Sequence, residues 1–141
     1  MSEKLKLSNQ ICFPFYAISR KIIKAYTPLL KDLDLTYPQY LVMLLLWEND
    51  NILIKDICDK LILETNTISP LLETLVKKGF ISKIKHSGNN KEVFVSLTKK
   101  GESLKIKAET IPDKLLANYN IKNTDLIGLH KTIWNFLEIF E

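Results

Sequence analysis

The stretch "ETNTISPLLETLVKKGFISKIKHSGNNKEVFVSLT", residues 64–98, contains the two patterns that define the fold. Its first half has apolar residues at helical spacing after small polar residues that could cap a helix: Thr65, Asn66 and Thr67, then Ile68, Leu71, Leu72, Leu75 and Val76. Gly79 is a natural stop for that helix. From residue 81 apolar and polar residues alternate on both sides of the polar turn "HSGNN", which predicts a β-hairpin.

The segment before this stretch completes a helix-turn-helix. "LIKDICDKLIL", residues 53–63, predicts a short amphipathic helix with Ile54, Ile57 and Leu61 on one side. Two short helices joined by a few residues are typical of a helix-turn-helix, and the hairpin that follows would be its wing.

A central buried helix is predicted further upstream, in "LTYPQYLVMLLLWEND", residues 35–50. Thr36 and Gln39 have the spacing of a capping box, and Pro38 suits a first helical turn. The segment is apolar nearly all round, which is typical of a buried helix, and Asn49–Asn51 would end it.

Long amphipathic helices are predicted at both ends of the chain. One apolar stripe contains Phe15, Ile18, Ile22, Tyr26, Leu29 and Leu33, and the other contains Leu126, Leu129, Ile133, Phe136, Leu137 and Phe140. A helix that restarts at residue 99 would end or kink at Pro112. The winged core already has its own central helix, so we expect the terminal helices to pack against a second copy of the chain.

The predicted fold is therefore mainly α, with about six helices and a two-stranded wing. We expect one domain over residues 1–141, with dimerisation helices at 7–34 and 113–141 and the winged helix-turn-helix at 35–100.

The positive charge is concentrated around the wing. Residues 77–107 carry nine lysines and two glutamates, whereas residues 1–76 have a net charge of −1 and residues 108–141 a net charge of −2. A solvated lysine surface is the common explanation, and a surface facing double-stranded DNA is the functional one. The predicted DNA-binding residues are Thr65, Asn66, Thr67, Ser69, Lys77, Lys78, Lys83, Lys85 and Lys91, and His86, Lys99 and Lys100 also suit phosphates.

Composition argues against several other classes of protein. Two cysteines, Cys12 and Cys58, make neither a disulfide framework nor a metal cluster. We find no CxxC or cofactor motif, no apolar run of membrane-spanning length and no signal peptide. We therefore expect a cytoplasmic protein that is not an enzyme and uses neither metal nor cofactor.

Three segments resemble the MarR family of winged-helix regulators, and in particular its OhrR-type branch of organic hydroperoxide sensors. They are "NQICFPFYAISRKIIKAYTPLLKDLDLTYPQYLVMLLLWE" (9–48), "LILETNTISPLLETLVKKGFI" (61–81) and "KEVFVSLTKKGE" (91–102). The resemblance covers roughly residues 7–107. It implies a homodimer that binds a pseudo-palindromic operator and is switched by oxidation of a cysteine.

The same resemblance assigns a sensor site. Cys12 would be the oxidised residue, Tyr26 and Tyr37 would hydrogen-bond its sulfur, and Tyr16 would occupy a further position in the pocket. The chain has no cysteine after Cys58. It therefore resembles the one-cysteine type, which forms a mixed disulfide with a small cellular thiol or becomes overoxidised.

The chemistry of Cys12 can also be argued from the residues alone. A peroxide sensor needs a thiolate, and Pro14 suggests that a helix begins near Cys12, where the helix dipole stabilises negative charge. Cys12 and Tyr26 are 14 residues apart, or about 21 Å along one helix. If the two side chains meet, the tyrosine must come from the partner.

Other interpretations stay open at this point. Cys12 could be an inert helix residue in a regulator released from DNA by a small phenolic or apolar ligand. A thiol peroxidase, or an interaction module that has lost DNA binding, is a further alternative. Departures from the family pattern are Glu73 and Thr74 in the recognition helix, and Asn89 and Lys91 where the family wing has Asp and Arg.

Overall fold

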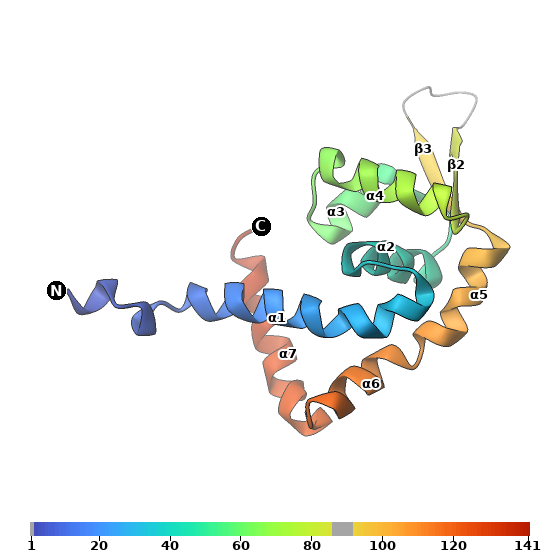
Figure 1. Ribbon diagram of the computed structural model, residues 1–141. Helices are drawn as coiled ribbons and strands as arrows, with labels where there is room; N and C mark the ends of the chain where they lie inside the picture. The colour runs from blue at the N-terminus through green and yellow to red at the C-terminus, as the bar shows by residue number, and fades with distance from the viewer. Residues whose placement is uncertain (1, 86–91) are drawn as a thin grey trace.

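The computed structural model describes residues 2–85 and 92–141 and confirms a mainly helical winged-helix fold (Figure 1). Three short 3-10 turns are η1 (Glu3–Leu5), η2 (Leu7–Asn9) and η3 (Lys31–Leu33). The helices are α1 (Cys12–Leu30), α2 (Tyr37–Glu48), α3 (Ile54–Leu61), α4 (Thr65–Lys77), α5 (Lys99–Ala108), α6 (Ile111–Asn118) and α7 (Asn123–Glu138), and the strands are β1 (Ile52–Leu53), β2 (Ile81–Lys85) and β3 (Val93–Leu97).

The helix-turn-helix and the wing lie together at one end of the molecule (Figure 1). α3 ends where Ile62 adopts the left-handed conformation, with φ 55°, and α4 ends before Gly79, with φ 79°. The predicted stop at Gly79 is therefore confirmed. Glycine adopts this positive φ without strain, because it has no Cβ. β2 and β3 pair antiparallel with Lys83 opposite Val95. The predicted turn "HSGNN" and Lys91 lie outside the described residues.

The wing sheet has one strand more than the sequence predicts. β1 pairs antiparallel with β3, with Ile52 opposite Val95, so the strand order is β1-β3-β2. Two residues are too few to show an alternating pattern, and only the pairing with β3 makes them a strand. Asp50 fixes this edge, because its carboxylate accepts a hydrogen bond from Leu97 N at 2.8 Å.

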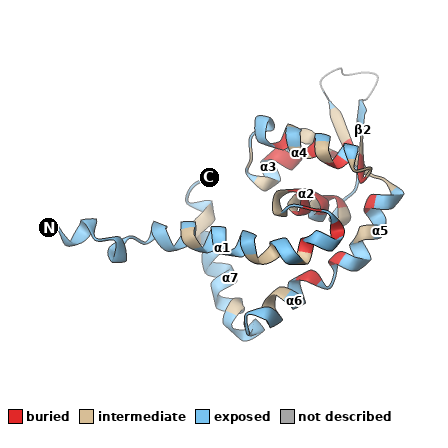
Figure 2. Ribbon diagram, viewed as in Figure 1, coloured by how far each residue is buried: buried red, intermediate tan, exposed pale blue. Residues whose placement is uncertain are grey.

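The hydrophobic core surrounds α2, as its apolar sequence predicts (Figure 2). Gln39 is the buried polar residue of this helix, only 5% exposed, and it completes the predicted capping box. Its backbone N–H donates to Thr36 Oγ1 at 3.4 Å, and its Oε1 accepts from Thr36 N at 3.1 Å. Fully buried side chains from five helices and two strands meet here: Leu30, Met43, Leu46, Ile57, Ile68, Leu72, Leu75, Ile81, Val95 and Ile111.

Two helix boundaries differ from their predictions. Thr65, Asn66 and Thr67 do not cap α4: Glu64 is the N-cap residue without a side-chain hydrogen bond, and the three polar residues form the first turn. Pro112 lies in the first turn of α6, so α5 and α6 are separate helices. A proline needs no backbone N–H donor in a first turn, which explains its place there.

The two terminal helices leave broad apolar surfaces uncovered within the protomer (Figure 2). α7 buries no residue, and α1 buries only Leu30. The two helices meet where the rings of Phe15 and Phe136 stack with centroids 5.1 Å apart. Large apolar side chains that stay exposed include Ile11, Phe13, Ile18, Ile22, Ile127, Leu129, Trp134 and Phe140. No helix in residues 2–85 and 92–141 is long and apolar enough to cross a membrane.

Candidate DNA-binding face and thiol site

The first turn of α4 presents small polar side chains to solvent. Thr65, Asn66 and Thr67 are exposed, and Ser69 is half-buried. The opposite side of the helix is anchored in the core by Ile68, Leu72 and Leu75, which are fully buried. A helix held in this way can offer its N-terminal residues to base edges and phosphates.

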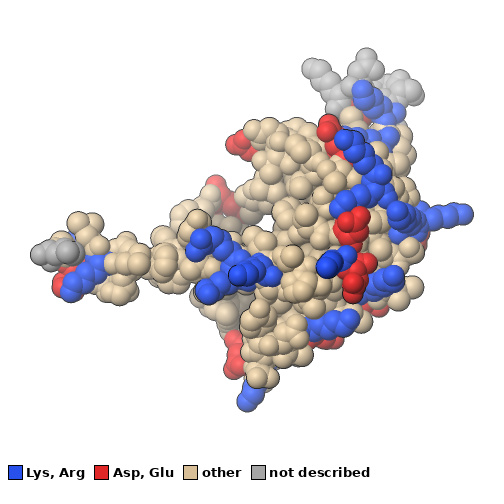
Figure 3. All heavy atoms as spheres, in the orientation of Figure 1, with Lys and Arg blue, Asp and Glu red and all other residues tan. Residues whose placement is uncertain are grey.

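Basic side chains lie at the other end of α4, on β2 and at the start of α5. Figure 3 shows lysines gathered over the wing side of the molecule, near the strands and the start of α5. The exposed lysines here are Lys77 at the end of α4, Lys83 and Lys85 on β2, and Lys99 and Lys100 at the start of α5. Glu73 is also exposed on α4. The surface made by α4, β2 and the start of α5 is called the basic face below.

Lys78 is placed differently from the other predicted phosphate ligands. Its Nζ donates to the backbone oxygen of Asp34 at 2.6 Å and to Gln39 Oε1 at 3.1 Å. It also lies 3.4 Å from the Asp34 carboxylate, and its side chain is only 23% exposed. The ammonium is thus engaged within the protomer, and we leave Lys78 out of the proposed DNA contacts.

A second basic region lies in the N-terminal part of the chain and was not predicted from the charge of residues 1–76. Residues 4–31 contain six basic and no acidic residues, whereas residues 32–76 contain two basic and eight acidic ones. Their opposite charges nearly cancel when residues 1–76 are counted together, so the net charge of that range shows neither region. Arg20, Lys21 and Lys24 are exposed on α1, and Figure 3 shows basic side chains gathered over this helix.

Cys12 is the first residue of α1, as the position of Pro14 predicts, and it is exposed. The positive end of a helix dipole favours an anion, so this position suits a thiolate. Tyr16 lies one turn further along α1 and is 62% exposed, with the Arg20 guanidinium 4.8 Å from its ring centroid. Cys12 and Tyr16 therefore share one end of α1.

Tyr26 and Tyr37 lie together at the opposite end of α1, with ring centroids 4.7 Å apart. Tyr40 completes the cluster, 5.7 Å from Tyr26 and 6.2 Å from Tyr37. Sequence reasoning missed Tyr40, although its spacing of three from Tyr37 puts both on one face of α2. These three side chains are called the tyrosine cluster below.

The hydroxyls of the tyrosine cluster stay protonated at neutral pH. Burial raises the pKa of Tyr37, and burial followed by repulsion from Tyr37 raises the pKa of Tyr26. Burial, then repulsion from Tyr26 and Tyr37, raises the pKa of Tyr40 to about 12. Neutral phenols can donate hydrogen bonds to a sulfur anion without adding a competing charge. Since α1 is one continuous helix from Cys12 to Leu30, about 21 Å separates Cys12 from Tyr26 within a protomer.

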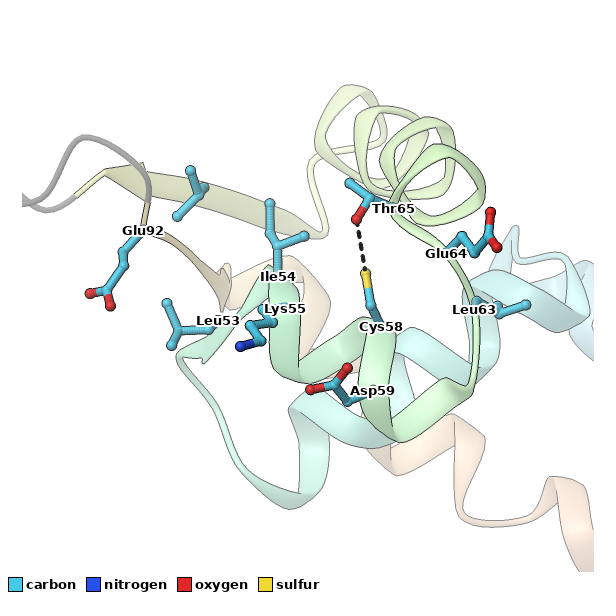
Figure 4. A pocket seen from close by; sticks show the side chains of 10 residues that line it. Leu53, Ile54, Lys55, Cys58, Asp59, Leu63, Glu64, Thr65 and Glu92 are labelled. Atoms are coloured by element: carbon cyan, nitrogen blue, oxygen red, sulfur yellow. Dashed lines mark hydrogen bonds between the residues drawn. The ribbon is translucent and has the colours of Figure 1, made fainter. Parts of the chain in front are cut away.

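Cys58 occupies a different environment. It is buried in α3, and its Sγ lies 3.9 Å from Thr65 Oγ1 (Figure 4). It lines an open groove of about 790 Å³ between α3, the start of α4 and β3. Buried cysteine usually serves as a small apolar residue, so the structure favours the structural role predicted for Cys58. No group of three or more His, Cys, Asp or Glu side chains in the described part of the chain could hold a metal ion.

A helix-turn-helix with an exposed polar recognition helix and a basic hairpin defines a winged-helix DNA-binding protein. Comparison with known proteins agrees with this class. The chain is 38% identical over 136 residues to the organic hydroperoxide resistance transcriptional regulator of Bacillus subtilis, covering 96% of this chain and 92% of that protein. It is 33% identical over 135 residues to the HTH-type transcriptional regulator SarZ of Staphylococcus aureus, covering 96% and 91%.

The family follows from a match to residues 24–108: the chain belongs to the SarA/Rot family of transcriptional regulators. A solved structure of reduced AbfR bound to DNA superposes with a TM-score of 0.81 at 27% identity and covers 99% of both chains. The resemblance to MarR-like winged-helix regulators, and the prediction of a transcription regulator rather than an enzyme, are thus confirmed.

Proposed function

We propose that this protein is a homodimeric regulator that binds operator DNA in the cytoplasm and is released when organic hydroperoxides oxidise Cys12. The observation that carries the proposal is the arrangement on α1. An exposed cysteine lies at the N-terminus of this helix, and a cluster of neutral tyrosines lies at its other end. The relative from B. subtilis, described as a regulator of organic hydroperoxide resistance, supports the choice of oxidant.

The proposed reaction at Cys12 needs only a thiolate and a hydroperoxide. The sulfur anion attacks the terminal oxygen of ROOH, the O–O bond breaks, and the alkoxide leaves and takes a proton from solvent water as ROH. Cys12 is then a sulfenic acid. A small cellular thiol, RSH, can condense with it, forming an S–S bond and releasing water. Cys58 does not suit the role of second thiol, because it is buried in α3 beside Thr65.

A dimer would bring the two halves of the sensor together. Antiparallel packing of two α1 helices would put Cys12 and Tyr16 of one protomer beside the tyrosine cluster of its partner. The exposed apolar side chains of α1 and α7 supply the surface for such an interface. Oxidation would then change a contact between protomers rather than within one.

The same dimer would place two α4 helices in successive major grooves, about 34 Å apart. In this arrangement Thr65, Asn66, Thr67 and Ser69 are suited to base edges and phosphates, while Lys77, Lys83 and Lys85 are suited to phosphates. Lys91 belongs to this set by sequence alone. A shift between the protomers would move α4 out of register with one half-site.

A second candidate is a regulator released by a small ligand, and one cavity favours it. A cleft of about 280 Å³ lies between α2 and the α5–α6 region. Its lining combines the apolar and aromatic residues Tyr40, Leu44, Trp47, Ala108 and Pro112 with the charged residues Glu48, Lys105 and Glu109. In this case a phenolic or apolar ligand would act at the cleft, and Cys12 would be incidental.

One experiment separates the two candidates. A gel shift with DNA from upstream of the protein's own coding sequence is run before and after cumene hydroperoxide treatment, for wild type and Cys12→Ser. We expect oxidation to release wild type and to leave Cys12→Ser bound. Equal behaviour of the two proteins would exclude Cys12 as the switch. Cys58→Ser is the matched control and should respond like wild type.

A further inference from the structure

Lys78 connects three elements that are far apart in the sequence. It is the C-cap residue of α4. Its ammonium donates to the backbone oxygen of Asp34, 44 residues earlier, and to Gln39 Oε1, 39 residues earlier. Its own backbone oxygen accepts a hydrogen bond from Lys100 Nζ at 2.9 Å, which adds the start of α5.

Both acceptors of the Lys78 ammonium lie at the junction between α1 and α2. Asp34 closes η3 in the left-handed conformation, with φ 55°, and its backbone N–H donates to the oxygen of Lys31 at 3.0 Å. Gln39 belongs to the capping box that starts α2. Tyr37 is the first residue of the same helical turn and packs on Tyr26. The ammonium therefore binds the turn that carries one member of the tyrosine cluster.

The contact is well suited to transmit a displacement. Gln39 is 5% exposed, and its one carbonyl oxygen accepts from both Thr36 N and Lys78 Nζ. Moving the first turn of α2 away from α4 would take one of its two donors from a buried amide oxygen and would separate a partly buried ammonium from its acceptors, which is costly. Neighbouring Lys77 is exposed and faces no such constraint.

We propose that Lys78 is a positioning residue that couples the tyrosine cluster to the recognition helix. Its ammonium holds the C-terminal end of α4 to the turn containing Tyr37. A change in the hydrogen bonding of Tyr37 upon oxidation of Cys12 therefore changes the orientation of α4. This role rests on the proposed function and replaces the phosphate contact that the sequence predicts for Lys78.

The test compares Lys78→Met with Lys77→Met, a matched pair of neighbours in which one lysine is held and the other is exposed. Fluorescence anisotropy measures the Kd for the upstream DNA duplex at several salt concentrations, before and after treatment with cumene hydroperoxide. We expect Lys78→Met to keep the wild-type slope of log Kd against the logarithm of the salt concentration, called the salt slope below. The ratio of its Kd in the oxidised state to its Kd in the reduced state should fall by about 2- to 30-fold, the range seen when coupling residues are changed.

Lys77→Met should behave in the opposite way. Removing one phosphate-binding ammonium from each protomer lowers the salt slope by about 1.8 for the dimer and leaves the ratio of the two Kd values unchanged. If Lys78→Met lowers the slope in the same way and keeps the wild-type ratio, Lys78 is a phosphate ligand and the proposal is overturned. If Lys78→Met does not fold, Asp34→Asn gives a milder variant, because asparagine tolerates the left-handed conformation. It removes the 3.4 Å ion pair and leaves both hydrogen bonds of the Lys78 ammonium in place. The ratio of the two Kd values should therefore fall by less than about 3-fold while the salt slope stays that of wild type; a lower salt slope with an unchanged ratio would overturn the proposal.

If the proposed function is wrong, the binding assay gives a different result from the one that overturns the role of Lys78. Wild type would then stay bound after peroxide treatment, whatever side chain stands at position 78. Amide hydrogen exchange of the free protein still tests the interaction in that case. Lys78→Met should speed exchange in the last turn of α4 and the first turn of α2 together, whereas Lys77→Met should leave the latter unchanged. Unchanged exchange in α2 for Lys78→Met would also overturn the proposal.

Discussion

Gly101→Ala tests how closely α5 packs against the backbone of Phe80, the residue before β2. Gly101 is the third residue of α5 and is buried against the backbone of Phe80. A Cβ added there would overlap the Phe80 carbonyl oxygen and lie 2.9 Å from its carbonyl carbon. Alanine usually stabilises a helix relative to glycine, by about 1 kcal/mol. At residue 101 we expect Gly101→Ala to destabilise the protein instead.

The expected change in the free energy of unfolding of Gly101→Ala is the sum of three contributions. The gain in helix propensity is about 1 kcal/mol. Relieving the overlap moves α5 away from Phe80, and overpacking of this kind costs about 1–3 kcal/mol. The same movement breaks the hydrogen bond from Thr98 N to Phe80 O, at 3.1 Å, which contributes about 1 kcal/mol. The free energy of unfolding should therefore fall by about 1–3 kcal/mol.

Gly128→Ala is the matched control. Gly128 lies within α7, and a Cβ there would meet nothing within 4 Å. The substitution should raise the free energy of unfolding by about 0.5–1 kcal/mol. Urea denaturation at one fixed protein concentration measures both, because association also contributes to stability. A higher urea midpoint for Gly101→Ala than for wild type would refute the packing between α5 and Phe80.

Two further predictions concern the tyrosine cluster and the thiols. Burial raises the pKa of Tyr40 to about 12, so the folded state retains a proton that the unfolded chain releases near pH 10. Stability should therefore be lost as pH rises from about 10 toward 12, and Tyr40→Phe should weaken this loss in urea denaturation series; an identical pH dependence for both proteins would contradict the assignment. Low doses of cumene hydroperoxide should oxidise exposed Cys12 and leave buried Cys58 reduced, as measured by mass spectrometry of thiol-labelled peptides. Oxidation of Cys58 first would contradict the burial of its thiol.

Local patterns in the sequence were sufficient for most of the fold. The Thr36–Gln39 capping box, the glycine stop at residue 79 and the alternating strands each depend on neighbours within a few residues. The start of α1 at Cys12 likewise follows from Pro14, which is tolerated in a first turn. The helix-turn-helix, the wing and the family could be recognised for this reason.

The helices and the wing could be predicted from the sequence alone, because periodicity, capping and turn chemistry are local properties. The candidate sensor residues came from the resemblance to the OhrR-type branch. Which residues meet across the chain depended on the tertiary structure. Pairing with β3 made Ile52–Leu53 a strand, and packing of α2 on α1 added Tyr40 to the tyrosine cluster. The fold also turned Lys78 from the basic face toward Asp34 and Gln39. Such contacts depend on how separate helices pack, and no spacing along a single segment encodes them.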